Sequence, residues 1–370
     1  MLKGKTIAVV VPAYNEETQI GFVIEEMPDF VDKIVVVNDC SKDKTEEIVR
    51  SFWESPFNEG IRIENITTLE ITGRYQRANR ILQEQNKIES KFFVDAKIEN
   101  KNPENDRIVL ISHKNNAGKG AGIATGYKWA KDHGIDCTAT MDGDGQMDPS
   151  ELESICLPVI AEGIDYVKGN RLIHHSAALV IPKIRFFGNS VLSILTKLAS
   201  GYWSVSDTQT GYTAISNKAL NAIRLHKIYK AYGYPNDMLV KLNIAMCTLK
   251  EVEIKPVYDV GEKSKMKVNK VIPRVSWLLL KSFFKRIWTR YFLKDFHPLF
   301  ILYNLAFLLF FISIPFAIRI ISYFLTTDAN PGERPILNSI MFMFLVVSSS
   351  QSLLFAMWMD IQDNERLYKY

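Results

Sequence analysis

The chain has 370 residues, 47% of them hydrophobic, with 45 Lys and Arg against 41 Asp and Glu and a formal net charge of +4. This length allows one large domain or two ordinary ones, and the composition is that of a globular protein. Ten of the basic residues lie between 263 and 294, where there is no acidic residue, so the rest of the chain is net acidic. Because this basic belt adjoins long apolar runs, it favours anionic lipid head groups and argues against nucleic acid as a partner.

Alternating strand and helix patterns fill the first half of the chain. Thr6–Val11 and Lys33–Val37 are continuous β-branched and apolar runs, as in buried parallel strands, and Ile20–Met27 between them has helical spacing. A further strand is expected at Arg107–Ser112, whereas the polar residues 51–106 break the rhythm. The pattern predicts an α/β fold with a mainly parallel sheet, helices on both of its faces, and an insertion at 51–106.

The stretch Thr138–Ser150 begins like a buried strand and continues into an acidic turn. Asp142, Asp144 and Gln146 place three oxygen side chains at alternate positions, a donor set that suits Mg²⁺ or Mn²⁺ and shares the ion readily with phosphates. Asp148 and Pro149 then have the pattern of a helix start. The acids are therefore expected where a strand ends and a helix begins, the usual ligand edge of an open α/β sheet. The other interpretation is an acidic surface turn without a ligand.

Glycines and a lysine precede another predicted helix, in the segment His113–Gly122. Backbone N–H groups at such a helix start can receive a phosphate group. The spacing differs from that of a P-loop, and a tight loop packed closely on the sheet is an equal alternative.

The last third of the chain has the pattern of a membrane anchor. An apolar stripe at helical spacing comes first, formed by Trp277, Leu280, Phe284, Ile287 and Tyr291. Basic residues, among them Arg286 and Arg290, occupy the other faces, so an amphipathic helix in a membrane interface is expected. Pro298–Ile318 and Pro335–Met359 contain no charged residue and are each long enough to cross a bilayer. The basic belt before the first span predicts a cytoplasmic soluble domain.

Four short motifs follow successive predicted strands: Pro12-Ala-Tyr-Asn-Glu16, Asn38-Asp39 with Asp43, Gly118-Lys-Gly120 and Asp142-Gly-Asp-Gly-Gln146. With these motifs in this order, the chain resembles the family 2 glycosyltransferases of the GT-A fold over about residues 5–270. Gly169-Asn-Arg171 and the Gly-Tyr-x-x-Asp segment ending at Asp237 extend the likeness. Two spans behind a basic amphipathic helix make it similar to the polyprenyl-phosphate glycosyltransferases, the class of the dolichol-phosphate mannose synthases.

The resemblance implies a domain organisation. A cytoplasmic GT-A domain would occupy residues 1–260, with 51–106 as an insertion. Residues 261–296 would form a basic amphipathic juxtamembrane segment, 297–325 and 335–359 two transmembrane helices, and 360–370 a cytoplasmic tail. The protein would thus be integral to the membrane, with its catalytic domain on the cytoplasmic side.

The resemblance also implies roles for the residues that match its motifs. The nucleotide-sugar donor would be bound by Pro12, Tyr14, Glu16, Asp39, Lys119 and Asp142. The divalent ion would be held by Asp142, Asp144 and Gln146. The acceptor phosphate would be met by Arg171, Arg185 and Lys265. The catalytic acids would be Asp144, Asp207 and Asp237, of which the last two would face the sugar or the acceptor.

The implied reaction is an inverting transfer of one sugar from a UDP- or GDP-linked donor to a dolichyl or undecaprenyl phosphate, with Mg²⁺ or Mn²⁺ as cofactor. Another lipid or a polysaccharide is an alternative acceptor. A catalytically silent membrane scaffold is the alternative of another class, and the intact Asp142 and Asp144 argue against it. Membrane lipids are expected partners, and a homo-oligomer is left open.

Overall fold

The computed structural model describes residues 1–68, 72–181, 183–257, 268–325 and 336–370, without the side chains of residues 68, 178, 183–189 and 268–271. The chain forms two compact units, which are described separately. The first comprises Met1–Ser282 together with Leu367–Tyr370, and the second comprises Phe283–Arg366.

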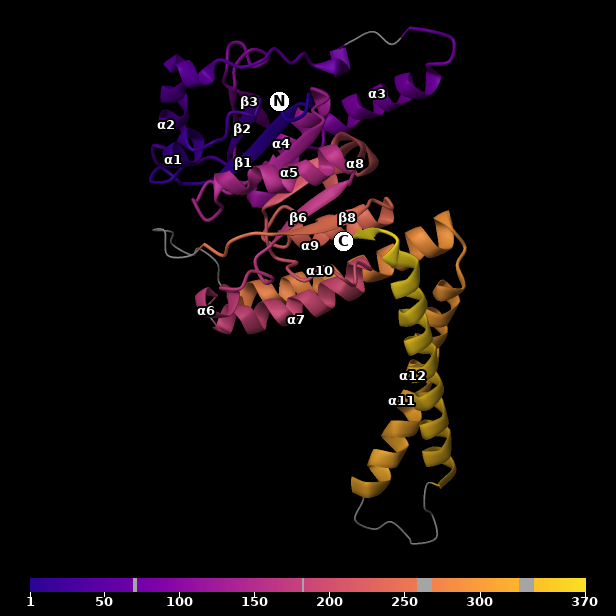
Figure 1. Cartoon of the computed structure of the whole chain (residues 1–370). Helices are drawn as coiled ribbons and strands as arrows, with labels where there is room; N and C mark the ends of the chain where they lie inside the picture. Colours follow the sequence, from indigo (N-terminus) through magenta and orange to yellow (C-terminus); the bar gives the residue numbers. More distant parts are fainter. Residues whose placement is uncertain (69–71, 182, 258–267, 326–335) are drawn as a thin grey trace. The chain divides into compact units, whose positions relative to one another are not determined.

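A nine-stranded sheet forms the centre of the first unit, in the order β3-β4-β2-β1-β5-β7-β6-β8-β9 (Figure 1). Its strands are β1 Ile7–Ala13, β2 Lys33–Asn38, β3 Ala96–Ile98, β4 Ile108–His113, β5 Cys137–Thr140, β6 Tyr166–Asn170, β7 Thr213–Ser216, β8 Leu249–Glu253 and β9 Tyr368–Lys369. Neighbouring strands run parallel except in the pairs β3–β4, β5–β7 and β6–β7. The predicted mixed, mainly parallel sheet is therefore confirmed.

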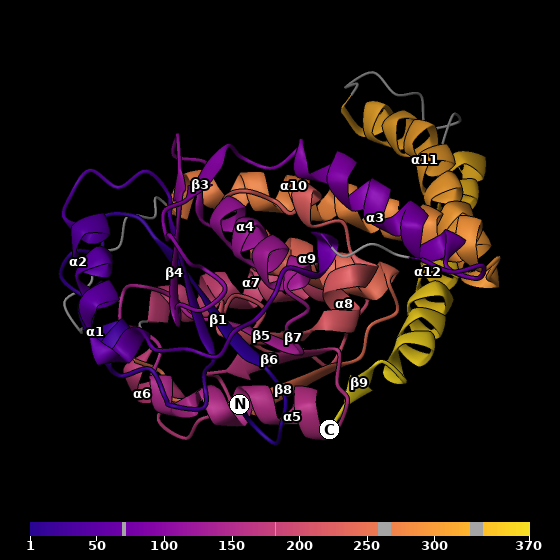
Figure 2. The same ribbon diagram turned by 90° about the horizontal axis from the view of Figure 1, so that it is seen from above.

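Helices cover both faces of this sheet, and Figure 2 shows α4 and α5 on opposite sides of the strands. The helices of the sheet domain are α1 Ile20–Glu25, α2 Thr45–Ser51, α3 Arg77–Ser90, α4 Lys119–Asp132, α5 Leu152–Ala161, α6 Ala177–Val180, α7 Lys183–Ser200, α8 Asn217–Ala222 and α9 Tyr234–Ile244. Successive side chains of a strand point to opposite faces, so each strand serves two cores. Val10 belongs to a core shared with α4 and α9, and Val11 to a core shared with α1 and α5. This is the GT-A arrangement that the resemblance implies.

The stretch 51–106 contains little of the core. Three 3-10 turns, at Phe52–Glu54, Pro56–Asn58 and Ile66–Thr68, precede α3, which has no buried residue. The end of the stretch belongs to the sheet, because β3 pairs antiparallel with β4, with Lys97 opposite Ser112. A strand of three exposed residues leaves no periodicity from which it could have been predicted.

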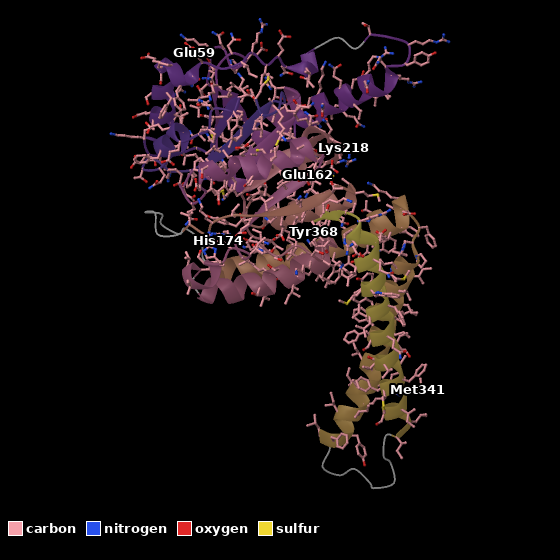
Figure 3. The ribbon with its side chains drawn as sticks, viewed as in Figure 1. Glu59, Glu162, His174, Lys218, Met341 and Tyr368 are labelled. Carbon is pink, nitrogen blue, oxygen red and sulfur yellow. The ribbon has the colours of Figure 1, made fainter. Side chains whose placement is uncertain are left out.

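Two long helices dominate the second unit. Helix α10 (Val268–Trp288) runs from the first unit into the second and is followed by a π-helical turn at Thr289–Lys294, by α11 (Pro298–Leu325) and by α12 (Ile336–Glu365). Both α11 and α12 are long and apolar enough to cross a membrane, and only 22% and 17% of their most apolar windows are buried. Met341, labelled in Figure 3, is one of the exposed apolar residues of α12. The structure thus has helices where the two spans are predicted.

The predicted apolar stripe of α10 divides between two environments. Trp277, Leu280 and Phe284 are exposed, as expected of a helix face that meets a membrane. Ile287 and Tyr291 are instead buried inside the second unit. Trp277, Leu280 and Phe284, with the exposed Trp288 outside the predicted stripe, form the exposed apolar face of α10 that supports interfacial binding.

Two basic residues of α10 and its extension are buried, contrary to the sequence interpretation. Arg286 donates two hydrogen bonds of 2.7 Å to the carboxylate of Asp360 in α12. Arg290 donates to Asp363 at 2.5 Å. These two arginines therefore do not belong to an exposed basic face, as the interpretation of an amphipathic helix in a membrane interface would require. A guanidinium can be buried when a carboxylate meets it bidentately, and one-dimensional spacing does not reveal that partner.

We predict that Asp360→Asn destabilises the second unit strongly. Arg286 and Asp360 are both fully buried, so the substitution leaves a buried guanidinium without its counter-charge. Breaking such a pair costs about 3–5 kcal/mol. Thermal unfolding of the full chain in lipid nanodiscs should show a lower melting temperature than for Glu365→Gln, which neutralises an exposed acid of the same helix. Equal melting temperatures for the two variants would contradict the assigned pairing.

Candidate active site

The loops that follow β1 and β2 hold one another at the carboxyl edge of the sheet. The Asn15 N–H donates to Ser41 Oγ at 3.0 Å, and the Glu16 N–H donates to Thr45 Oγ1 at 2.9 Å. Asn15 has a φ of 55°, a left-handed conformation that asparagine adopts more readily than most residues. Because the carboxyl ends of parallel strands meet at one edge, these loops stand beside the loops of β4 and β5.

Asp39, directly after β2, fixes the loop that follows β4. Its Oδ1 contacts His113 Nδ1 at 2.8 Å and accepts the Ala117 N–H at 2.9 Å, and its Oδ2 accepts the Gly118 N–H at 2.7 Å. Burial raises the pKa of Asp39, but the hydrogen bonds from His113 and the two N–H groups outweigh burial and lower it below its usual value. Both carboxylate oxygens already have partners within the chain. The predicted contribution of Asp39 to nucleotide binding would therefore act through the shape of this loop.

Two glycines bring the same loop against the segment 229–231. Gly118 has a φ of +94°, and a Cβ there would lie 2.6 Å from the carbonyl oxygen of Lys230. At Gly120 a Cβ would lie only 2.0 Å from the carbonyl oxygen of Tyr229, while the Gly120 N–H donates to Lys230 at 2.9 Å. Close backbone approach of this kind requires glycine. Packing against the segment 229–231 is therefore sufficient to explain why glycine occupies both positions. The role of these glycines in phosphate binding stays a prediction.

Lys119, the first residue of α4, forms an ion pair with Asp142, just beyond the end of β5. Asp144 lies two residues further along, and its Oδ1 accepts the Gln146 N–H at 3.1 Å. Burial and the charge of Asp142 raise the pKa of Asp144 to about 6, although Lys119 and the Gln146 N–H act in the opposite direction. Glu16 adds to the negative field around Asp144. Acidic groups therefore outnumber the single lysine at this position.

These residues fit a divalent cation. The raised pKa of Asp144 means that the surroundings disfavour a second negative charge beside Asp142, and a bound cation would remove that penalty. Carboxylate and amide oxygens are the ligands that Mg²⁺ and Mn²⁺ prefer. The turn also ends as predicted, since Asp148 accepts the Ser150 N–H at 2.9 Å and Pro149 takes the first helical position. The acids thus stand on a fixed strand-to-helix turn.

A second group of charges follows β6. Arg171 donates through Nε to Asp207 at 2.8 Å and through a terminal nitrogen to its other oxygen at 3.1 Å. Burial raises the pKa of Asp207, but Arg171 and Lys168 outweigh burial and lower it, so this carboxylate stays ionised. Lys168 is buried as well; burial lowers its pKa to about 8, and it donates to the carbonyl of Thr210. The structure places Asp207 as the partner that orients Arg171.

Asp237, in the first turn of α9, also makes internal contacts. Its Oδ2 accepts the Tyr229 N–H at 2.8 Å and forms an ion pair with Lys241 one turn further along. Tyr229 is the residue whose carbonyl packs against Gly120, so Asp237 holds this segment beside the start of α4. Both Asp207 and Asp237 are nearly fully buried, and their predicted catalytic roles stay predictions.

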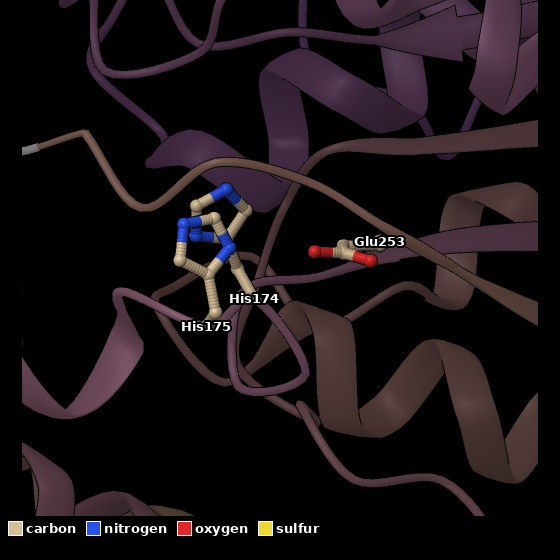
Figure 4. A group of neighbouring side chains, drawn as sticks. All are labelled: His174, His175 and Glu253. Atoms are coloured by element: carbon tan, nitrogen blue, oxygen red, sulfur yellow. The ribbon is translucent and has the colours of Figure 1, made fainter.

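His174, His175 and Glu253 form the group of potential metal ligands found among the described residues (Figure 4). One ligand atom of each lies within 4.8 Å of the others. The two imidazole rings stack, with centroids 4.4 Å apart and planes 26° from parallel. A ring nitrogen binds a metal in the plane of its ring, so two nearly parallel rings do not direct their nitrogens at one ion. In this arrangement the stacked rings argue against the binding of one ion by both histidines.

The sequence-predicted residues fall into two sets. The donor set lies near the carboxyl ends of β1, β2, β4 and β5, with Pro12 still within β1 and Lys119 at the start of α4; it comprises Pro12, Tyr14, Glu16, Asp39, Lys119, Asp142, Asp144 and Gln146. Arg171 belongs to the other set, after β6, together with Asp207. Lys265 and the side chain of Arg185 lie outside the described residues, so their contacts with a phosphate stay predictions.

Sequence reasoning missed three residues that organise the site: His113, Lys168 and Glu251. Lys168 and Glu251 are charged residues within β6 and β8, and a charge inside an otherwise apolar run is a signal that could have been used. For His113, the last residue of β4, no pattern in the sequence indicates the contact with Asp39.

Comparison with known proteins relates the larger part of the sheet domain, from β1 to α8, to one family. The sequence model of glycosyl transferase family 2 matches residues 8–68 and 93–224. The UDP-N-acetylglucosamine–dolichyl-phosphate N-acetylglucosaminyltransferase of Methanococcus voltae is 29% identical over 258 residues, covering 70% of this chain and 88% of that protein. A dolichyl-phosphate beta-glucosyltransferase of Trichomonas vaginalis is 24% identical over 304 residues, covering 76% and 75%.

A solved structure with a similar chain course is the glucosyl-3-phosphoglycerate synthase of Mycobacterium tuberculosis, in complex with Mn²⁺, UDP and glucosyl-3-phosphoglycerate. It is 17% identical, with a TM-score of 0.45, and the match covers 76% of this chain and 80% of that one. The family match leaves out residues 69–92, a narrower stretch than the 51–106 in which the sequence rhythm is lost.

We predict that Gly120→Ala distorts the start of α4. A Cβ there would meet a backbone carbonyl, which cannot move aside as a flexible side chain would. Overpacking of this kind costs about 1–3 kcal/mol. Gly21→Ala is the matched control, because Gly21 also lies in a helix. Its added Cβ would be 3.6 Å from the side chain of Ile48, which is an ordinary contact distance. Chemical denaturation should give a lower free energy of unfolding for Gly120→Ala than for Gly21→Ala. An unchanged free energy of unfolding for Gly120→Ala would show that the close approach is not required.

Proposed function

Because the chain belongs to glycosyl transferase family 2, we propose that it transfers a sugar from a nucleotide-sugar to a polyprenyl phosphate at a membrane surface. The observation that carries this proposal is the half-buried pair Asp142 and Asp144 beside Lys119 at the carboxyl end of β5. Such a site suits a diphosphate that arrives with a divalent cation. Two relatives that are named as dolichyl-phosphate glycosyltransferases match most of the chain and support the class of acceptor.

Donor binding would use the loops of the first four parallel strands in the chain. Asp142, Asp144 and Gln146 would hold Mg²⁺ or Mn²⁺, which when bound stabilises the negative charge that develops on the departing diphosphate. Lys119 would supply a second positive charge at the same place. The ordered loop that Asp39 fixes would form the wall of the nucleotide pocket.

Acceptor activation needs little from the protein. A phosphate monoester is anionic at neutral pH and is already a nucleophile, so its oxygen can attack the anomeric carbon without a general base. That bond forms as the bond to the diphosphate breaks, and the nucleoside diphosphate leaves with the electron pair. Arg171, held bidentately by Asp207, would position the acceptor phosphate for attack from the opposite face, which inverts the anomeric centre.

Anchoring in a membrane would bring the site to its lipid. The exposed face of α10 and the two long apolar helices have the composition of an interfacial helix and two spans. Residues 367–370, which follow α12, belong to the same unit as the site, so the chain would have to return to the side from which it left. The basic belt favours the cytoplasm for that side.

We predict metal-dependent transfer to lipid phosphate. The full chain in nanodiscs would be incubated with labelled nucleotide-sugars, starting with UDP-N-acetylglucosamine and then UDP-glucose and GDP-mannose, and with polyprenyl phosphate. Label should reach the lipid phosphate in the presence of Mn²⁺ or Mg²⁺ and stop when the ion is chelated. If the label reached a neutral lipid or a polysaccharide and not the polyprenyl phosphate, the proposed acceptor class would be wrong. Absence of transfer and of nucleotide binding would contradict the enzyme assignment.

We predict that Asp144→Asn lowers kcat at least a hundredfold while the fold persists. The substitution keeps the shape of the side chain but removes the charge that would hold the ion, and electrostatic groups of this kind contribute about 10²–10³ in kcat. Asp95→Asn, the same change at an exposed acid, is the control and should leave kcat unaltered. Activity of Asp144→Asn equal to that of the control would remove Asp144 from the metal site.

A further inference from the structure

A short strand rejoins the catalytic sheet after α12. Strand β9 pairs parallel with β8, with Tyr368 opposite Leu249, and the Leu249 N–H donates to the carbonyl of Leu367 at 2.7 Å (Figure 1). Leu367 is nearly fully buried and belongs to the core that also contains residues of α4 and α9. The segment 367–370 is therefore a structural part of the sheet domain.

The hydroxyl of Tyr368 reaches a carboxylate on the neighbouring strand. It donates to Glu251 Oε2 at 3.4 Å, and Figure 3 labels Tyr368 at this edge of the sheet. The Glu251 carboxylate in turn accepts the backbone N–H groups of Ser206, at 3.0 and 3.1 Å, and of Asp207, at 3.1 Å. One side chain of β8 thus connects β9 to the loop that carries Asp207.

Asp207 is the residue that orients Arg171 through two hydrogen bonds. The contacts therefore form a continuous series from Tyr368 through Glu251 and Asp207 to Arg171. We propose that Tyr368 is a positioning residue for the acceptor phosphate, which acts by fixing Glu251 and, through it, the Ser206–Asp207 loop and Arg171. This rests on the proposed function, in which Arg171 meets the acceptor.

Physical chemistry favours a real effect of this single hydroxyl. Glu251 is a largely buried carboxylate, and burial raises its pKa although the Ser206 and Asp207 N–H groups act in the opposite direction. A buried carboxylate is held in place by the donors around it, and without the Tyr368 hydroxyl Glu251 Oε2 would keep the Ser206 N–H but lose its contact with β9. Loss of the Tyr368 hydroxyl would leave the Ser206 and Asp207 N–H groups as partners of Glu251 and would hold this carboxylate, and with it their loop, less firmly.

The donor set should not be affected by this change. Lys119, Asp142 and Asp144 lie on α4 and after β5, and none of their hydrogen bonds involves β8 or β9 in the described part of the chain. A positioning role therefore predicts a selective defect. A role confined to folding would instead lower stability and weaken donor and acceptor binding together.

The kinetic test compares two tyrosines in the full chain in nanodiscs. Tyr368→Phe removes only the hydroxyl and keeps the ring and the β9 pairing. Tyr370→Phe makes the same change two residues away, at a side chain that is 87% exposed. We expect Tyr368→Phe to raise KM for polyprenyl phosphate about fivefold or more, the equivalent of one hydrogen bond, with KM for the nucleotide-sugar unchanged. An unaltered acceptor KM, or equal shifts for donor and acceptor, would overturn the proposal.

A second measurement does not depend on activity. Hydrogen exchange followed by mass spectrometry should show faster exchange in the peptide that contains Ser206 and Asp207 for Tyr368→Phe and for Glu251→Gln, with exchange around Asp142 unchanged. Tyr370→Phe should match the unaltered protein. Unchanged exchange at Ser206 and Asp207 in Tyr368→Phe would overturn the positioning role. If the unaltered protein transfers no sugar, the proposed function fails, while this exchange measurement still decides whether Tyr368 holds the loop.

Discussion

Excess negative charge at the carboxyl end of β5 is the constraint on which the candidate site depends. Asp142 and Asp144 stand close enough that burial and mutual repulsion raise the pKa of Asp144, and Lys119 compensates only one of them. Folding alone gains nothing from such crowding, and proteins retain it where a ligand supplies the missing positive charge. The start of α4, which carries Lys119, is held in place beside these acids: Asp39 binds the loop before α4, and Asp237 binds the segment that packs on Gly120.

The same acids illustrate how carboxylates that look alike in sequence differ in role. Asp142 and Asp144 are half-buried and face one lysine, whereas Asp207 and Asp237 are almost fully buried and paired with Arg171 and Lys241. The first pair would suit a cation, and the second pair orients chain segments and a guanidinium. The two charged clusters, one after β5 and one after β6, would suit the proposed reaction between two phosphorylated substrates, one entering with a metal ion and the other meeting an arginine.

Much of the fold and of the candidate site could be predicted from the sequence. Buried parallel strands appear as continuous apolar runs, and their carboxyl ends meet at one edge of the sheet. The strand–helix order, the acidic turn and the two long apolar helices were found in this way. Contacts between segments that are distant in the sequence could not be predicted. The burial of Arg286 against Asp360 joins residues 74 positions apart, and β9 is two residues long, so neither leaves a periodic signal. Asp39 matches a family motif, yet its bonds to Gly118 depend on the folded loop.

The most direct test of the central claim is the coupling between ion and nucleotide in the intact protein. Calorimetric titration would measure the Kd of UDP with and without Mn²⁺, and the Kd of Mn²⁺ with and without UDP. If Asp142 and Asp144 hold an ion that the diphosphate shares, each ligand should tighten the binding of the other by the same factor, as linkage requires. Binding of UDP that is indifferent to Mn²⁺, or binding of Mn²⁺ that is indifferent to UDP, would contradict the account.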